Sequence, residues 1–357
     1  MKAVILCAGQ GTRLRPLTHT GAKHLLPVAN RPILFHVLDR LVEAGIDEVC
    51  VVVSEGAAKM RAALGHGEEW NIRIEYATQH APRGLAHAVN VTREFVGDDR
   101  FLVYLGDNLL EDGVRDFVRS AWEEATDGAV LLAEVSDPSR FGVAQLDAQG
   151  RLIAVQEKPA NPPSNLALTG VYAFTPAIFE SIARIRPSDR GELEITDAIQ
   201  DLLDRGCSVT ARQVEGWWLD TGMPDDVLRA NQLLLEALPV EDAVDPDEVD
   251  FQVEGRVYCE EGVQVKDSLV RGPAILGADC HIERAFIGPF SAIGAHCRIV
   301  DTELENSILM PDCDIQGVPF SLDSSILGHE VIMRYTDESS ARNRLILADH
   351  SQLWLTS

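Results

Sequence analysis

Two closely spaced glycines and two cations near the N-terminus are the first residues whose types suggest chemistry. Gly9 and Gly11 follow an apolar run, and Arg13 and Lys23 come after them. Glycine lets the backbone turn tightly, so that N–H groups converge on one point and form a concave site for an anion. Arginine can clamp phosphate oxygens bidentately, whereas lysine supplies a point charge. We therefore predict that this segment binds a polyphosphate.

The spacing in this segment excludes the two common phosphate loops. The stretch GQGTR, residues 9–13, lacks the third glycine of a dinucleotide fingerprint and the Gly-Lys-Ser/Thr ending of a Walker loop. A solvated arginine on a turn is the ordinary alternative. The combination of GxGTR with KHLLPV, residues 23–28, argues against that alternative.

The composition limits the class of partner. The chain of 357 residues has 31 basic and 56 acidic residues, a formal net charge of −25, which argues against a nucleic-acid or anionic-membrane partner. Only five of the basic residues are lysines. An acidic, lysine-poor surface fits a halophilic protein, because charges are screened over about 3 Å in 1 M salt. A GC-rich genome that encodes arginine explains the composition equally well.

Cysteine usage and the N-terminus predict a cytoplasmic protein. The seven cysteines form no CxxC pair and are odd in number, which argues against a disulfide framework or a zinc site. The apolar run of residues 3–8 is short for a signal peptide, and no stretch approaches the roughly 18 apolar residues of a membrane span.

Residues 1–236 alternate between expected strands and helices. Short apolar runs predict strands over 3–7, 48–53, 72–77 and 101–107. A helix is expected over 32–45, ending at Gly45. Its apolar face consists of Ile33, Leu34, Val37, Leu38, Leu41 and Val42. The alternation predicts a Rossmann-like α/β domain with a mainly parallel sheet, whose ligands bind beyond the carboxyl ends of the strands.

A second domain is expected after an acidic, proline-containing linker at 237–250, and covers 251–334 before a tail at 335–357. Its aliphatic residues recur in steps of five, six and six, so that one set of steps covers 17 residues. Val265, Ile282 and Ile299 then stack, as do Val270, Ile287 and Leu304, and Cys280 and Cys297 keep the same offset. Gly277, Gly288 and Gly294 each follow an aliphatic residue of the repeat, where a corner between strands would need a small residue. The repeat predicts a left-handed parallel β-helix of about four coils rather than a β-meander.

With the stretches CAGQGTRLRPLT and AKHLLPVANRPIL, the chain resembles the sugar-1-phosphate nucleotidylyltransferases. YLGDN, VQEKP, RGELEITD and WWLDTG agree with this resemblance, which covers essentially the whole chain and is greatest to the long-form glucose-1-phosphate thymidylyltransferases with a β-helical tail. Ala22 and Arg31 depart from the residues usual in the family, and Ala22 could loosen the loop.

The resemblance implies attack of a sugar-phosphate oxygen on the α-phosphorus of a nucleoside triphosphate, with release of pyrophosphate. It implies the catalytic residues Arg13, Lys23, Asp107 and Lys158, and Mg²⁺ held by Asp107 and Asp220, since magnesium takes one or two carboxylates. The expected nucleotide-binding residues are Ala8, Gly9, Gly11, Thr12, Gln79, Pro82 and Gly84. The expected sugar-phosphate residues are Gly142, Glu157, Lys158, Thr169 and Arg190.

The residues limit the nucleobase that the enzyme binds, whereas the acceptor sugar and the pathway follow from the resemblance alone. The amide of Gln79 can donate to O4 and accept from N3–H of thymine or uracil, and Gly84 leaves room for backbone contact. The resemblance favours dTTP, with UTP as the alternative, and glucose-1-phosphate as the acceptor for deoxysugar, such as rhamnose, or surface glycan synthesis.

Two other functions compete with this prediction. A β-helix can carry acetyltransferase activity, for which His281, His296 and His329 are possible bases. The second alternative is a non-catalytic scaffold that resembles the subunits of a translation-initiation exchange factor. The chain retains the family's catalytic residue types, which argues against this alternative. The β-helix is otherwise expected to mediate contacts in a homo-oligomer.

Overall fold

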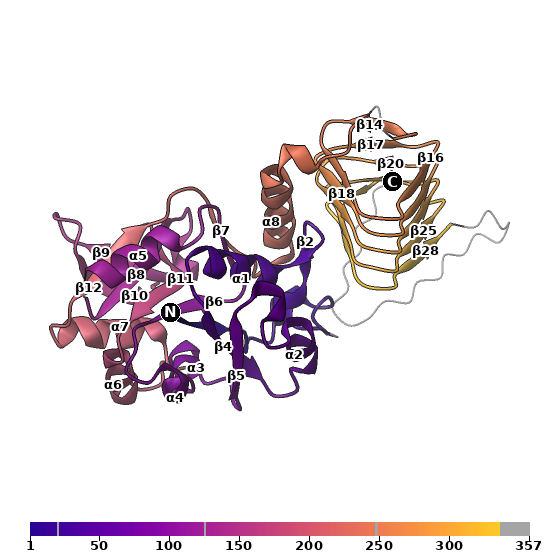
Figure 1. Ribbon diagram of the computed structural model, residues 1–357. Coiled ribbons are helices and arrows are strands. Elements are labelled where there is room, and N and C mark those ends of the chain that lie inside the picture. Colours follow the sequence, from indigo (N-terminus) through magenta and orange to yellow (C-terminus); the bar gives the residue numbers. More distant parts are fainter. Residues whose placement is uncertain (20, 125, 247–248, 336–357) are drawn as a thin grey trace. The chain divides into compact units, whose positions relative to one another are not determined.

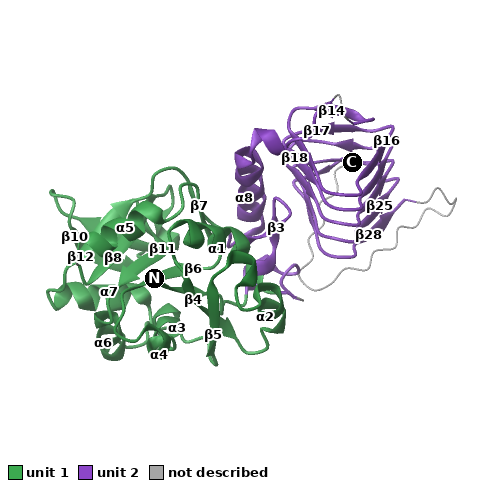
Figure 2. Cartoon of the chain, viewed as in Figure 1, with its two compact units in different colours: residues 1–10, 22–24, 34–220 green, residues 11–21, 25–33, 221–357 purple. Residues whose placement is uncertain are grey.

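The computed structural model describes residues 1–19, 21–124, 126–246 and 249–335, and the chain forms two compact units (Figure 2). Unit 1 consists of residues 1–10, 22–24 and 34–220, and unit 2 of 11–21, 25–33 and 221–357. All but the first residue of the expected tail at 335–357 lies outside the described residues. Within the described residues, no helix combines the length and apolar composition needed to cross a bilayer.

The sheet of unit 1 begins with four parallel strands. β1 (Lys2–Leu6) pairs in parallel with β4 (Glu48–Ser54) and with β6 (Phe101–Leu105), and β4 pairs in parallel with β5 (Arg73–Gln79). These are the four strands expected from the apolar runs, and continuous apolar runs are typical of parallel strands buried on both faces. The predicted Rossmann-like parallel sheet is confirmed (Figure 1).

The second half of this sheet is mainly antiparallel. β11 (Leu166–Phe174) runs antiparallel to β6 and to its neighbours β8 and β9, and β12 pairs in parallel with β8. The remaining strands are β8 (Gly128–Glu134), β9 (Gly142–Leu146), β10 (Leu152–Glu157) and β12 (Val209–Gln213). A separate antiparallel pair, β7 (Asn108–Leu110) and β13 (Trp218–Asp220), places Asp220 opposite Asn108. This pairing brings the end of β13 to the residue that follows Asp107.

Helix α1 (Ile33–Glu43) follows the predicted pattern with one exception. Five of the six predicted core residues are fully buried, but Val42 is 36% exposed. Val42 comes directly after Leu41 and therefore lies about 100° further around the helix, away from the apolar stripe. The helix ends as expected, because Gly45 has a φ of 78° and the N–H of Ile46 bonds to the carbonyl of Leu41.

The other helices of unit 1 are short. They are α2 (Ala58–Leu64), α3 (Leu85–Asn90), α4 (Arg93–Val96), α5 (Arg115–Glu123), α6 (Ala177–Arg184) and α7 (Ile195–Asp204). α3 packs against β1, α5 against β8 and α7 against β10, so that helices cover the sheet (Figure 1).

Unit 2 contains the predicted β-helix, built from three five-stranded parallel sheets (Figure 1). The first contains β14 (Gln252–Glu254), β17 (Leu269–Arg271), β20 (Phe286–Ile287), β23 (Glu303–Glu305) and β26 (Leu322–Asp323). The second contains β15 (Val257–Cys259), β18 (Ala274–Leu276), β21 (Ser291–Ile293), β24 (Ile308–Leu309) and β27 (Ile326–Leu327). The third contains β16 (Gln264–Lys266), β19 (His281–Glu283), β22 (Arg298–Val300), β25 (Asp314–Gln316) and β28 (Ile332–Arg334).

The register of the β-helix is the predicted one. Val265 is paired with Ile282 and Ile282 with Ile299, in adjacent parallel strands. Cys280 and Cys297 are buried, and their thiols donate to backbone carbonyls, so they are structural as expected. The expected length of about four coils was too short, since each sheet has five strands in the described residues.

Unit 2 also contains α8 (Pro224–Ala237) and two N-terminal segments. The buried Asn231 of α8 accepts a hydrogen bond from the N–H of Ala29 at 2.8 Å and donates to the carbonyl of Phe290 at 2.8 Å. Asn30 donates to the carbonyl of Ile293 at 2.6 Å. Residues 25–33, which include β2 (Pro27–Val28) and β3 (Arg31–Pro32), are therefore bonded to α8 and to the β-helix.

Candidate active site

A buried ion pair lies at the carboxyl end of the central strand β6. Lys23, at the start of the 3₁₀ turn η2 (Lys23–Leu25), donates through Nζ to Oδ2 of Asp107. Burial opposes the charge of Asp107, but the ammonium of Lys23 outweighs it and lowers the pKa of this carboxyl. Burial likewise opposes the charge of Lys23, while Asp107 raises the pKa of its ammonium. Both side chains are therefore ionised, and the site keeps two opposite charges out of water.

Gly9 and Asp220 belong to the same group of residues. A Cβ on Gly9 would lie 3.4 Å from Cε of Lys23, so the glycine turn and the cation are neighbours, as predicted. The carboxylate of Asp220 acts on Lys23, whose pKa it helps to raise. Lys23 therefore interacts electrostatically with both predicted metal ligands, Asp107 and Asp220. Two carboxylates form a donor set that suits Mg²⁺, which completes its shell with phosphate oxygens and water.

Neutral residues pack beneath Asp107, and the sequence analysis missed them. A Cβ on Gly106 would lie 2.5 Å from Sγ of Cys7 and 3.1 Å from Cδ2 of His24, so only glycine fits beside this carboxylate. Burial, and then the charge of Lys23, lowers the pKa of His24 to about 3. His24 is therefore uncharged. Its position in KHLLPV, next to the predicted cation, was the signal available for it.

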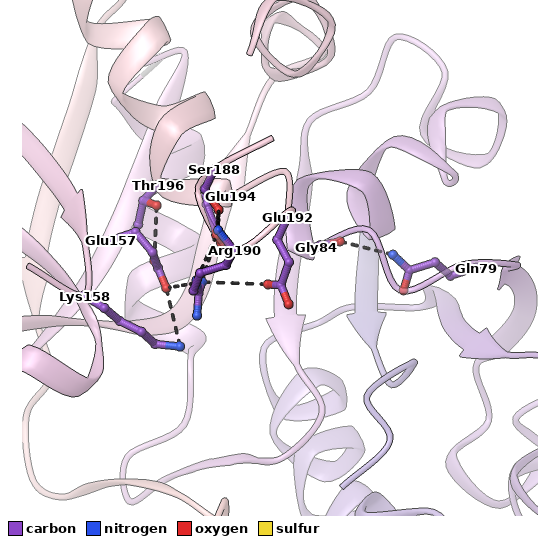
Figure 3. A network of polar contacts seen from close by, with 9 residues as sticks. All are labelled: Gln79, Gly84, Glu157, Lys158, Ser188, Arg190, Glu192, Glu194 and Thr196. Atoms are coloured by element: carbon purple, nitrogen blue, oxygen red, sulfur yellow. Dashed lines mark hydrogen bonds and ion pairs between the residues drawn. The ribbon is translucent and has the colours of Figure 1, made fainter. Parts of the chain in front are cut away.

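A second group of charges lies at the end of β10, where the sequence predicted a sugar-phosphate site (Figure 3). Nη2 of Arg190 donates to Oε1 of Glu157 at 3.0 Å and to Oε1 of Glu194 at 2.8 Å. Nζ of Lys158 lies 3.7 Å from Oε1 of Glu157. Arg190 also forms a longer ion pair of 3.7 Å with Glu192. The structure thus brings Glu157, Lys158 and Arg190 together, as predicted.

Glu194 is the buried member of this group and was not predicted. Its Oε1 accepts from Nε of Arg190 at 3.2 Å and from Oγ of Ser188 at 2.7 Å. Burial, and then the neighbouring charge of Glu194, raises the pKa of Glu157. The second acid of RGELEITD was the available signal, but a sequence does not show which carboxylate a long arginine side chain reaches.

Of the two other predicted sugar-site residues, the structure places one beside this group and one in the core. Gly142 is paired with Glu157 across β9 and β10, and a Cβ there would lie 2.7 Å from Cγ2 of Thr196. Thr169 is fully buried, and its hydroxyl donates to the carbonyl of Leu131 at 3.0 Å. Within the described residues the Thr169 hydroxyl is thus used inside the sheet, and the expectation that Thr169 lines the sugar pocket stays a prediction.

The predicted base-recognition residues lie where β5 ends and α3 begins. Gln79 is the last residue of β5, Pro82 is exposed, and Gly84 has a φ of 102°. A Cβ on Gly84 would lie 2.4 Å from the carbonyl oxygen of Leu193, so glycine is required here. Nε2 of Gln79 donates to the carbonyl of Gly84 at 3.1 Å (Figure 3).

The remaining predicted residues belong to the N-terminal loop. Ala8 packs against the core of unit 1. Gly11 has a φ of 60°, and its carbonyl accepts from Oγ1 of Thr18 at 2.7 Å. Thr12 and Arg13 form the 3₁₀ turn η1 (Thr12–Leu14) and, with Gly11, belong to unit 2. A tight turn at this glycine is therefore confirmed.

Comparison with known proteins places this geometry in a family. Residues 2–237 match the family described as nucleotidyl transferase. The chain is 44% identical over 360 residues to a glucose-1-phosphate thymidylyltransferase of Streptomyces antibioticus, covering 100% of both chains. It is 42% identical over 362 residues to the low-salt glycan biosynthesis nucleotidyltransferase Agl11 of Haloferax volcanii, covering 99% of this chain and 100% of that protein.

A solved structure agrees with these relatives. UDP-glucose pyrophosphorylase complexed with UDP-glucose matches with a TM-score of 0.61 at 26% identity, and the match covers 66% of this chain and 99% of that chain. The chain belongs to the nucleotidyl transferase family. It is a nucleotidyltransferase enzyme.

Proposed function

We propose that this enzyme transfers a thymidylyl group from dTTP to glucose-1-phosphate, giving dTDP-glucose and pyrophosphate. Two charged groups at strand ends of unit 1 carry the proposal, namely Lys23 with Asp107 and Arg190 with Glu157. The chain that holds them is similar over its full length to a glucose-1-phosphate thymidylyltransferase. An oxygen of the sugar phosphate attacks the α-phosphorus, and the bond between the α-phosphorus and the oxygen bridging to the β-phosphorus breaks.

Each group of residues supports one part of this reaction. Arg190 and Lys158 bind the sugar phosphate, and the carboxylate of Glu157 accepts hydrogen bonds from sugar hydroxyls. Lys23 neutralises charge at the α-phosphate, and Arg13 binds the departing pyrophosphate. Since both substrates are polyanions, catalysis consists mainly of positioning and charge neutralisation.

Magnesium fits this site as a cofactor. Asp107 and Asp220 would hold the ion, because both are carboxylates beside Lys23 and Asp107 is ionised. Bound there, it would supply positive charge to the phosphate oxygens. Lys23 offsets the charge of Asp107 before the ion binds.

UTP is the second candidate nucleotide. The structural similarity to a UDP-glucose pyrophosphorylase favours it, and a 5-methyl group is worth only about 1 to 3 kcal/mol in a fitted pocket. The test is pyrophosphate release with Mg²⁺ and glucose-1-phosphate, with dTTP, UTP, ATP, GTP and CTP offered in turn. A preference for dTTP supports the proposal, and a preference for UTP makes UTP the nucleotide substrate in place of dTTP. If no nucleotide gives pyrophosphate release, the proposed function is contradicted.

The cellular setting is part of the same proposal. We place the enzyme in the cytoplasm as a halophilic homo-oligomer that supplies deoxysugar or surface glycan synthesis. The acidic, lysine-poor composition and the glycan biosynthesis relative of Haloferax volcanii support this setting. Activity that rises between 0.1 M and molar KCl, together with the mass in solution from light scattering, tests salt adaptation and assembly.

A further inference from the structure

The amide group of Gln79 has one defined orientation. Its Nε2 lies 3.1 Å from the carbonyl oxygen of Gly84 and 3.0 Å from Nδ1 of His87. A carbonyl oxygen only accepts hydrogen bonds, so the nitrogen end of the amide, and not the oxygen end, must face Gly84. In Figure 3 the oxygen of Gln79 is turned away from Gly84. The amide carries two hydrogens, and these two neighbours use both of them.

His87 provides the second acceptor. It lies in α3 one turn after Gly84 and is half-buried. To accept from Gln79, its Nδ1 must be unprotonated, which requires the neutral imidazole with its proton on Nε2. Burial, and then the charge of Arg83, lowers the pKa of His87, so the ring is neutral at pH 7. The electrostatics of the ring therefore agree with the geometry.

This arrangement corrects one expectation from the sequence. Gln79 was expected to donate to O4 of the base and to accept from N3–H, but both hydrogens of its amide are already used. Only Oε1 remains, and among the described residues no hydrogen bond to Oε1 is found. The side chain therefore offers a ligand an acceptor and no donor.

We propose that His87 is a positioning residue that holds the Gln79 amide with Oε1 toward the nucleobase, and thereby selects a pyrimidine whose N3 carries a hydrogen. This inference rests on the proposed function and names the part of the base that the site recognises. Thymine and uracil donate from N3–H to Oε1. Cytosine has an unprotonated N3 at the same place, so two acceptors would face each other.

Substitution of His87 separates positioning from a general effect on the fold. His87→Leu removes one of the two acceptors of Nε2, so that only the carbonyl of Gly84 still holds the Gln79 amide and the amide flips more readily to present Nε2. His87→Gln restores an acceptor oxygen on a side chain of similar length. His80→Leu is the matched control, because His80 lies in the same segment but is exposed and contacts Glu55.

The experiment measures kcat and KM for dTTP and dCTP, and KM for glucose-1-phosphate, in these variants. We expect His87→Leu to raise the KM for dTTP and to lower the preference for dTTP over dCTP, each about tenfold, the size of one hydrogen bond left unmade. kcat and the KM for glucose-1-phosphate should stay near wild type. His87→Gln should restore the preference, and His80→Leu should match wild type.

Two results would overturn the inference. One is an unchanged dTTP preference in His87→Leu, and the other is an equal loss for both substrates accompanied by a lower melting temperature. If the wild-type enzyme releases no pyrophosphate with any nucleotide, the proposed function fails instead. Calorimetric binding of dTTP and dCTP to wild type and His87→Leu then decides the inference without turnover, and equal affinity ratios contradict it.

Discussion

The two charged groups in unit 1 differ in how many partners each cation has. Among the described residues Lys23 is hydrogen-bonded to one carboxylate, that of Asp107, and the two side chains are only 19% and 10% exposed. Arg190 is 41% exposed and divides its guanidinium among Glu157, Glu192 and Glu194. Removing one member of a buried pair leaves an uncompensated charge, whereas a shared, solvated cation retains other partners. Substitutions should therefore affect stability in the first group and substrate affinity in the second.

The largest effect is expected for Asp107→Asn. Turnover should fall about a hundredfold or more, in the range found when one group that stabilises transition-state charge is removed. The free energy of unfolding of the variant should also fall by about 3–5 kcal/mol, because Lys23 stays buried and charged. Steady-state kinetics and urea denaturation measure the two effects. Asp112→Asn, an exposed acid in the following turn, is the control. Normal turnover in Asp107→Asn would remove this residue from the active site.

Lys158→Ala should act on affinity and not on stability. Because the proposed function makes Lys158 a point charge at the sugar phosphate, its loss should raise the KM for glucose-1-phosphate about tenfold and leave the KM for dTTP unchanged. Its melting temperature should stay within a few degrees of wild type. Lys266→Ala, an exposed lysine of the β-helix, serves as the control. An unchanged KM for the sugar phosphate would contradict the role of Lys158.

Within the second group, Glu194 and Glu192 should differ although both contact Arg190. Glu194→Gln weakens a buried acceptor of three hydrogen bonds and should cost about 1–3 kcal/mol of folding free energy. Glu192→Gln removes only a 3.7 Å ion pair and should cost less than about 0.5 kcal/mol. Chemical denaturation compares the two variants. Equal costs would show that the buried hydrogen bonds of Glu194 contribute nothing beyond its charge.

The smallest effect concerns pH. Burial, and then Glu194, raises the pKa of Glu157, so this side chain stays protonated at higher pH than an ordinary glutamate. Only the ionised form accepts strong hydrogen bonds from sugar hydroxyls. kcat/KM for glucose-1-phosphate should therefore fall, as the pH is lowered, with an apparent pKa above the ordinary glutamate value, and this limb should be absent in Glu157→Gln. An identical acid limb in both proteins would assign it to another group.

Periodicity and motifs predicted much of this molecule, and the failures have common causes. The strands, α1 and the stacking of Val265 on Ile282 follow from local spacing, because burial on a regular element repeats with its geometry. Gln79 was assigned a free donor that the structure uses internally. Its partner His87 lies on another element, α3. A motif gives the residue types at a site, but it does not show which of their atoms are already bonded.

The path of the chain between the two compact units limits how the protein can be recombined. The chain changes unit after residues 10, 21, 24, 33 and 220, and not once at a linker. A chimera that exchanged only residues 221–357 would keep the native Ala29 and Asn30, but the side chain of Asn231 and the native placement of the carbonyl of residue 293, to which they bond, would come from the other protein. A β-helix taken from a relative would therefore have to be transplanted together with residues 25–33. The evolution of residues 25–33 is in this way tied to the evolution of the C-terminal half of the chain.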